Sequence, residues 1–174
     1  MPSADQPARP PSRVPSGGRP GVAFLLAQVG AHAAGRFATR VSELDLTPAQ
    51  AGLLRAVSTA PGSSQQQLAT RLGLLPSRVV AFVDALEERG LVRRERSSTD
   101  RRQYALHLTD DGQALMRRLS RLARNHDRDL SGALTAPERE QLTELLQRIA
   151  AQQGLTVGVH PGYRQLDGGE RPAG

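Results

Sequence analysis

The sequence lacks cysteine, lysine and tryptophan altogether, and aromatic residues make up only 3% of its 174 positions. Without cysteine the chain can form no disulfide, no thiolate zinc site and no thiol-based redox sensor. No apolar run approaches the ~20 residues that a membrane-spanning helix needs. Residues 1–20 are rich in proline, serine and arginine and have no apolar centre, so they predict a disordered arm and not a secretion signal. We therefore expect a soluble, cytoplasmic protein.

Recognisable catalytic motifs are also missing. The chain has no Ser/His/Asp set, no glycine-rich phosphate loop and no paired carboxylates in a catalytic arrangement. His126 falls on an apolar helical seam, and no second histidine or carboxylate stands beside it at metal-ligand spacing. We expect no enzyme, no cofactor and no metal site, and interpret His126 as a buried interface residue in preference to a ligand.

Positive charge is what the chain has in excess. The net charge is +6, and all 23 basic residues are arginine, which GC-rich codon usage explains more simply than selection for phosphate binding. Residues 86–109 predict a helix end at Gly90, a strand, a polar turn and a second strand in which Tyr104, Leu106 and Leu108 alternate with other residues. The hairpin carries five arginines against Glu95 and Asp100. A hairpin of this charge suits an extended anion such as nucleic acid.

Helical patterns surround this hairpin. Apolar spacing predicts a long helix over 22–44, and three capping boxes predict helix starts after Thr47, Ser64 and Thr135. Gly73 ends the short helix that follows Ser64, and Pro76 begins the next one three residues later. Two short helices joined in this way predict a helix-turn-helix. A further long helix is expected from Thr109 to about 132. The fold class is therefore mostly α with a small β-hairpin wing.

Residues 22–152 resemble the MarR family of winged helix-turn-helix transcriptional regulators. The segments that carry the resemblance are LTPAQAGLLRAV, SQQQLATRLGL, VDALEERGLVRRERSSTDRRQYALHLTDDGQAL and LTAPEREQLTELL. The resemblance implies a homodimer in which recognition helices lie in successive major grooves and wings reach the minor groove. The long apolar faces of the terminal helices support a dimer independently, because one small winged domain could not cover them. The expected divisions are a disordered arm (1–20), a dimerisation helix (21–45), a winged helix-turn-helix DNA-binding domain (46–109), dimerisation helices (110–153) and a flexible tail (154–174).

DNA contacts are expected from the recognition helix and the wing. Arg78 is the candidate for reading a guanine edge, although a solvated surface arginine is the alternative. Leu75 stands where a capping residue is usual, and Val80 and Ala81 replace the polar or basic pair often found in the family. We therefore expect DNA specificity to depend more on groove shape and on contacts with thymine methyl groups. In the family, the counterpart of Asp100 orients the arginine that enters the minor groove, here Arg102. The expected DNA-binding residues are Ser64, Gln65, Ser77, Arg78, Ala81, Arg94, Arg96, Ser98, Asp100, Arg101 and Arg102.

We expect a transcriptional repressor that binds a pseudo-palindromic double-stranded operator as a homodimer. Such a regulator would be associated with the nucleoid. A small anionic or phenolic effector would release it, and His32, Arg36 and Arg40 form a stripe suited to such a ligand. Alternatively, that stripe pairs with acidic groups across the dimer. The arginines at 117, 121, 124 and 128 form a second stripe, either solvated or paired, or in contact with flanking DNA. The alternative functions are a winged-helix module for protein partners and a DNA-binding protein without a ligand.

Overall fold

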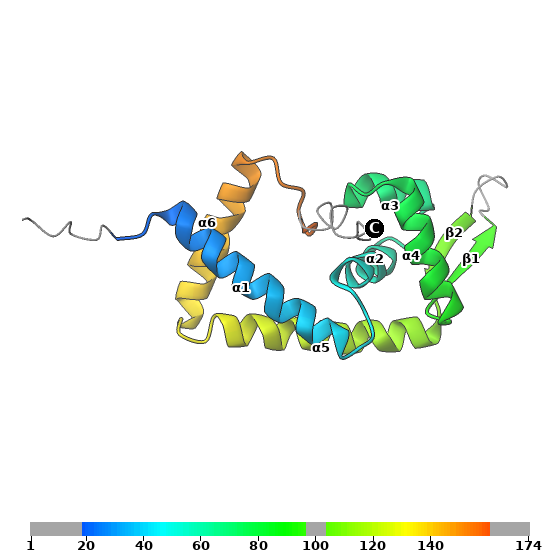
Figure 1. Ribbon diagram of the computed structural model, residues 1–174, viewed down its shortest axis with the longest axis horizontal. Helices are drawn as coiled ribbons and strands as arrows, with labels where there is room; N and C mark the ends of the chain where they lie inside the picture. Colours follow the sequence, from blue (N-terminus) through cyan, green and yellow to red (C-terminus); the bar gives the residue numbers. More distant parts are fainter. Residues whose placement is uncertain (1–18, 97–103, 161–174) are drawn as a thin grey trace, which may run out of the picture.

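The computed structural model describes residues 19–96 and 104–160, which form a helical protein with one β-hairpin (Figure 1). This confirms the predicted fold class. The elements, in chain order, are α1 (Val22–Ser42), α2 (Pro48–Thr59), α3 (Gln65–Leu72), α4 (Pro76–Glu88), β1 (Val92–Arg96), β2 (Tyr104–Leu108), α5 (Asp110–Leu130) and α6 (Ala136–Gln152).

The helix starts follow from capping residues in the sequence. The hydroxyl of Thr47 accepts a hydrogen bond from the Gln50 backbone N–H at 3.2 Å, and the Gln50 side chain accepts one from the Thr47 N–H at 2.9 Å. Ser64 and Gln67 repeat this arrangement before α3. Gly73 closes α3 with a φ of 63°, a left-handed conformation that favours glycine. Each reciprocal pair satisfies two backbone N–H groups that a helix N-terminus leaves unpaired.

The hydrophobic core lies in the winged domain formed by α2, α3, α4 and the hairpin. Leu53, Leu54, Leu68, Leu86 and Leu106 are all fully buried there. Burying a leucine side chain contributes roughly 1.5–3 kcal/mol, so these residues fix how the helices pack. Leu106 also ties the hairpin to the turn before α3, because its carbonyl accepts from the Gly62 N–H and its N–H donates to the Ser63 carbonyl.

Gly112 in the first turn of α5 sets how closely that helix approaches the hairpin. A Cβ at this position would lie 1.9 Å from the carbonyl oxygen of Leu91, which no side chain tolerates. Thr109 fixes the same junction: its hydroxyl donates to the Gly90 carbonyl at 2.6 Å and accepts from the Gly112 N–H at 3.0 Å. The wing and the long helix α5 are therefore joined without a flexible connection.

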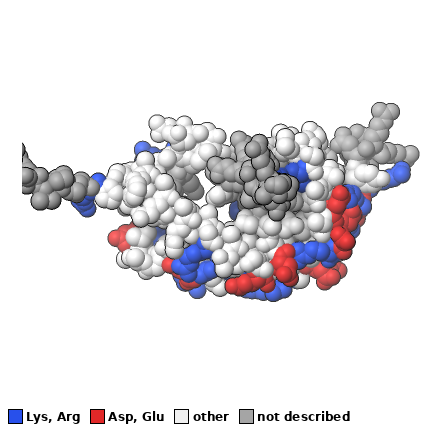
Figure 2. All heavy atoms as spheres, in the orientation of Figure 1, with Lys and Arg blue, Asp and Glu red and all other residues white. Residues whose placement is uncertain are grey.

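Helices α1 and α6 extend away from this core. Figure 1 shows α6 and the start of α1 at the end of the molecule opposite the hairpin, with α5 running between the two ends. Only Val41 is buried in α1, and no residue of α6 is buried. Most of the surface that they present in Figure 2 is uncharged. The large apolar side chains that these two helices expose are Val22, Phe24, Leu25, Leu26, Val29, Leu142, Leu145, Leu146 and Ile149.

Among the described residues, no helix is long and apolar enough to cross a membrane.

The segment after α6 returns toward the winged domain. We expected residues 154–174 to form a flexible tail, but Val159 packs against the hydrophobic core. A Cβ on Gly158 would lie 3.9 Å from a guanidinium nitrogen of Arg55 in α2. Contact with α2 explains why this part of the segment lies against the domain. Residues 161–174 of the expected tail, and the first 18 residues of the expected arm, lie outside the described residues.

Candidate nucleic-acid interface

A groove joins the three parts of the winged domain from which DNA contacts were expected. It has a volume of about 480 Å³, and its walls come from the start of α3, the start of α4 and the outer end of β2. The sequence predicted each of these parts separately, and the fold places them around one hollow. The lining residues are Ser64, Gln65, Gln66, Gln67, Pro76, Val80 and Tyr104.

Gln65 supplies an unused donor to this groove. Its side-chain nitrogen is buried and has no hydrogen-bond partner among the described residues. A buried amide donor without a partner costs roughly 1–3 kcal/mol, so an acceptor from a ligand would stabilise it. Ser64 has a different role, because it is 9% exposed and its hydroxyl caps α3. It therefore orients the helix N-terminus, whose partial positive charge favours an anion.

The outer face of α4 carries few polar groups. Ser77, Val80 and Ala81 are exposed, whereas Arg78 is half-buried. Leu75 is 61% exposed and forms no side-chain cap, as the sequence predicted. Small and apolar side chains of this kind fit against thymine methyl groups and provide few hydrogen bonds to base edges.

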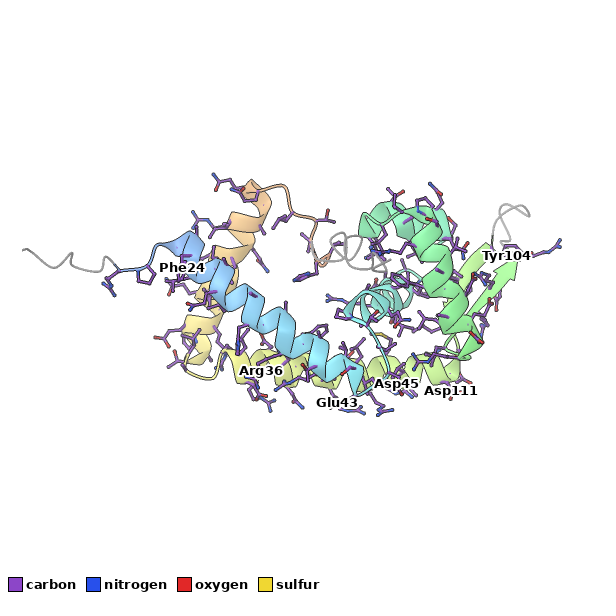
Figure 3. The ribbon with its side chains drawn as sticks, viewed as in Figure 1. Phe24, Arg36, Glu43, Asp45, Tyr104 and Asp111 are labelled. Atoms are coloured by element: carbon purple, nitrogen blue, oxygen red, sulfur yellow. The ribbon has the colours of Figure 1, made fainter. Side chains whose placement is uncertain are left out.

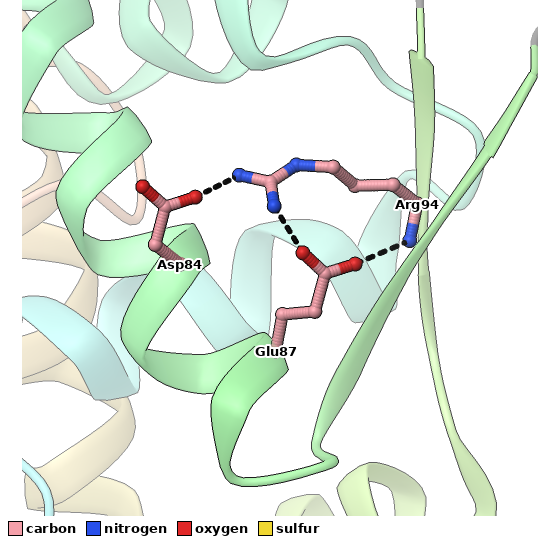
Figure 4. A network of polar contacts seen from close by, with 3 residues as sticks. All are labelled: Asp84, Glu87 and Arg94. Carbon is pink, nitrogen blue, oxygen red and sulfur yellow. Dashed lines mark hydrogen bonds and ion pairs between the residues drawn. The ribbon is translucent and has the colours of Figure 1, made fainter.

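Arg94 has partners that the sequence did not suggest. Its guanidinium donates to the carboxylates of Asp84 and Glu87 in α4, and its backbone N–H donates to Glu87 at 3.2 Å (Figure 4). The Arg94 side chain is only 22% exposed. Arg94 was expected to contact DNA, but in this structure it forms an internal ion-pair network, since strand β1 packs beside α4.

The ion-pair network of Arg94 offsets negative charge on α4. Burial lowers the pKa of the Arg94 guanidinium, but the hydrogen bond to Asp84 and the charges of Glu87 and Asp84 outweigh it and raise the pKa above its ordinary value. Arg94 therefore stays protonated and compensates two carboxylates that phosphates would otherwise repel. It also links the wing to the recognition helix.

Arg96 and Tyr104 form the last described pair at the outer end of the hairpin. Arg96 is exposed and pairs across the hairpin with Tyr104, which is 50% exposed. Figure 3 shows Tyr104 at the end of the hairpin farthest from α1. The expected contacts Ser98, Asp100, Arg101 and Arg102 lie outside the described residues.

The three residues of the predicted effector stripe on α1 have different surroundings in the structure. His32 and Arg36 are exposed, and Figure 3 shows Arg36 far from the hairpin. Arg40 forms an ion pair with Asp129 of α5 at 2.5 Å, which lowers the pKa of that carboxyl. The two helices of one chain are thus linked by a charge pair, the kind of contact that the alternative interpretation placed across a dimer.

His126 stacks against α1. Its ring lies 5.6 Å from that of Phe37, in a tilted arrangement. Burial, followed by the charges of Arg40 and Arg36, lowers the pKa of His126 below its ordinary value. The histidine is half-buried within this chain.

A cavity of about 400 Å³ lies between α1, α2 and α5. The predicted residues His32, Arg36 and Arg40 are not among those lining it. The residues that line it include Phe37 of α1, Arg55 of α2 and Met116 of α5. Sequence spacing missed Arg55 because nothing in its own helix distinguishes it from a solvated arginine.

The fold and the groove define a winged helix-turn-helix protein, and comparison with known proteins supports this class. The MarR family model matches residues 44–103. A putative transcriptional regulatory protein for the hcr operon of Thauera aromatica is 38% identical over 111 residues, which span 64% of this chain and 67% of the relative. The chain therefore belongs to the MarR family.

Two further relatives have solved structures. The HTH-type transcriptional repressor Rv2887 of Mycobacterium tuberculosis is 30% identical over 128 residues, which span 74% of this chain and 92% of the repressor. Its structures include one with DNA, at a TM-score of 0.66 and 27% identity over 75% of this chain and 98% of that one. Another structure of Rv2887 is a complex with salicylic acid. It has a TM-score of 0.61 and 29% sequence identity, and the match covers 76% of this chain and 98% of that one. The structure of the transcriptional repressor CouR bound to a 23-mer DNA duplex has a TM-score of 0.66 and 37% sequence identity. The match covers 75% of this chain and 92% of that one.

Proposed function

We propose that this protein is a transcriptional repressor that binds a pseudo-palindromic operator through the groove between α3, α4 and the wing. The observation that carries the proposal is the groove itself, where the first turns of two helices line the same hollow and one of the lining residues, Gln65, has a buried side-chain donor without a partner among the described residues. Helix N-termini and side-chain donors bind phosphate oxygens and fix the register of a duplex. The first turns of α4, with Ser77, Arg78 and Ala81, then enter the major groove.

The wing completes the contact. Arg96 lies on an exposed face of β1 and is placed to reach phosphate. Asp100 orients Arg102 for the minor groove, and Ser98 and Arg101 contact the backbone. These four positions remain sequence-based proposals. Arg94 has a different role from the one we expected, because it holds the wing against α4.

The working unit is a homodimer. Helix α6 has 17 residues and none of them is buried, although helices in proteins gain most of their stability from packing an apolar face. In α6, Leu145 is 44% exposed and Ile149 37%, and in α1 Val29 is 51% exposed. A two-fold partner that covers these apolar faces sets two recognition helices about one helical turn of DNA apart.

Effector binding is proposed for the cavity between α1, α2 and α5. Its wall combines the apolar Phe37 and Met116 with the single cation Arg55, a combination that fits a small aromatic carboxylate or phenol. Binding of salicylic acid by the relative Rv2887 supports this ligand class. We expect salicylate to weaken operator binding, and Arg55→Gln to reduce that effect.

Selection from a random duplex library tests the DNA assignment, and light scattering tests the dimer. The full-length protein should enrich an inverted repeat, and Gln65→Ala should weaken binding to it by roughly 1 kcal/mol. Gln153→Ala, beyond the end of α6, is the control and should bind the repeat normally. Recovery of no sequence, with a stable dimer present, would favour the alternative of a winged-helix module for protein partners.

A further inference from the structure

A second cavity lies on the other side of α2, between the hairpin and α5. It has a volume of about 690 Å³, which is within the range of sites for small organic ligands. It shares Ser58, Met116 and Ser120 with the cavity beside α1. The two cavities differ in charge, because the one beside α1 has a single arginine in its wall.

Five basic side chains line this second cavity. Two come from the hairpin and three from successive turns of α5, at i, i+4 and i+7. They are Arg93, His107, Arg117, Arg121 and Arg124. Among the described residues, no acidic side chain lines the cavity. Like charges at this helical spacing destabilise a helix by ~0.2–0.5 kcal/mol per pair, so an anion between them removes an unfavourable interaction.

Internal ion pairs account for only part of this charge. Glu95, outside the cavity wall, accepts from Arg93 at 2.6 Å and lies 3.6 Å from His107. Within the described part of the chain, the three arginines of α5 have no carboxylate within ion-pair distance. Three guanidinium groups therefore remain for a ligand.

The rest of the wall is apolar. Val57 of α2 is fully buried behind the cavity, and Leu108 of β2 and Met116 of α5 are half-buried beside it. A site with cations on one side and aliphatic groups on another suits a ligand that has an acidic head and an apolar body. Arginine binds phosphate oxygens through two parallel N–H groups, and a dianionic phosphate matches three guanidinium groups better than a single carboxylate does.

The cavity lies outside the exposed apolar surfaces that we propose for the dimer. Its walls come from α2, the residue Pro61 that follows it, the hairpin and α5. The apolar surfaces proposed for the dimer lie on α1 and α6, and neither helix contributes to the wall.

We propose that this cavity between α2, the wing strands and α5 is a binding site for a small phosphate ester with an apolar group. The phosphate lies against Arg117, Arg121 and Arg124, and the apolar group lies over Val57, Leu108 and Met116. The site is separate from the groove proposed for DNA and adjoins the cavity beside α1 without sharing its arginine.

Isothermal titration of the full-length protein with phenyl phosphate, in the absence of DNA, tests the site. We expect saturable binding that is at least tenfold tighter than that of benzoate. Arg117→Gln and Arg124→Gln should each weaken phenyl phosphate binding at least fivefold, and both positions are exposed, so the fold is retained. Arg128→Gln, on the same stripe but outside the cavity, and Arg55→Gln, in the other cavity, should bind as the parent does.

Three results would overturn the proposal. The first is no binding of phenyl phosphate at 10 mM. The second is binding that Arg117→Gln and Arg124→Gln do not change. The third is an equal loss in Arg128→Gln, which would indicate attraction to the whole stripe. Because the titration contains no DNA, its outcome is independent of whether an operator is found.

Discussion

Removing Arg94 is the perturbation that most sharply separates an internal role from a DNA contact. In Arg94→Gln the carboxylates of Asp84 and Glu87 lose their shared cation. Because Asp84 and Glu87 side chains are 58% and 38% exposed, the pairs are well screened, and we expect a loss of only about 1 kcal/mol in the free energy of unfolding. The protein should therefore fold.

The effect on operator binding comes from the two carboxylates that remain on α4. At a separation of about 8 Å, repulsion between a carboxylate and a phosphate is about 0.5 kcal/mol in water and about 2 kcal/mol at an effective dielectric constant of 20. Ionic screening reduces both values. We expect a loss of about 1 kcal/mol in operator affinity, which is roughly a fivefold rise in Kd.

Fluorescence anisotropy titrations of the operator between 50 and 200 mM salt provide the assay. Adding Glu87→Gln to Arg94→Gln should restore at least half of the lost binding free energy. Arg118→Gln on α5, which changes the net charge equally, should leave the Kd within twofold of the parent value. If Glu87→Gln restores nothing and the salt slope falls by about 1, Arg94 contacts a phosphate and the internal assignment is wrong.

Three further predictions concern the wing, the helix junction and pH. Arg102→Ala should weaken operator binding by at least ~1 kcal/mol, and an unchanged mobility-shift titration would contradict the wing assignment. Gly112→Ala should lower the free energy of unfolding by about 3 kcal/mol because of the contact with the Leu91 carbonyl, whereas Gly35→Ala, which meets nothing within 4 Å, should not lower it in urea titrations at equal protein concentration. His126 has a lowered pKa in the folded protein, so its contribution to stability is complete above the unfolded value of about 6.5 and is lost as pH falls below it. Parent stability should consequently fall more steeply than that of His126→Gln between pH 7.5 and 5.5, and parallel curves would exclude this origin.

Local signals in the sequence were enough to predict the elements. The helix starts depend on hydrogen bonds within one turn, between Thr47 or Ser64 and the glutamine three residues later. The backbone angles of Pro76 and Gly73 act over an equally short range. None of these effects depends on the rest of the fold. The hairpin followed from alternation around Leu106. For the same reason the residues at the start of α3 and α4 were identified before their common groove was visible.

Contacts between distant segments could not be predicted in this way. Arg94 was assigned to DNA because all wing arginines look alike in the sequence, and nothing in the sequence pointed to Asp84 and Glu87 as its partners. The pairing depends on β1 turning back along α4. Arg40 and Asp129 are 89 positions apart, and only the packing of α1 on α5 brings them together.

The cavities were the least predictable features. The stripe from Arg117 to Arg124 was visible, but the wall that His107 and Arg93 complete depends on the junction at Gly112. Glycine is unfavourable in a helix, and its presence in the first turn of α5 was a signal of close approach that sequence reasoning did not use.

The central claim is that the face formed by α3, α4 and the wing reads a DNA sequence as part of a dimer. Duplexes selected by the full-length protein, followed by titration of the enriched and a scrambled sequence at 150 mM salt, test it most directly. The account predicts two inverted half-sites whose centres lie about 10 base pairs apart, bound at least ~10³-fold more tightly than the scrambled duplex. Equal affinity for both duplexes, or enrichment of a single half-site by a stable dimer, would contradict it.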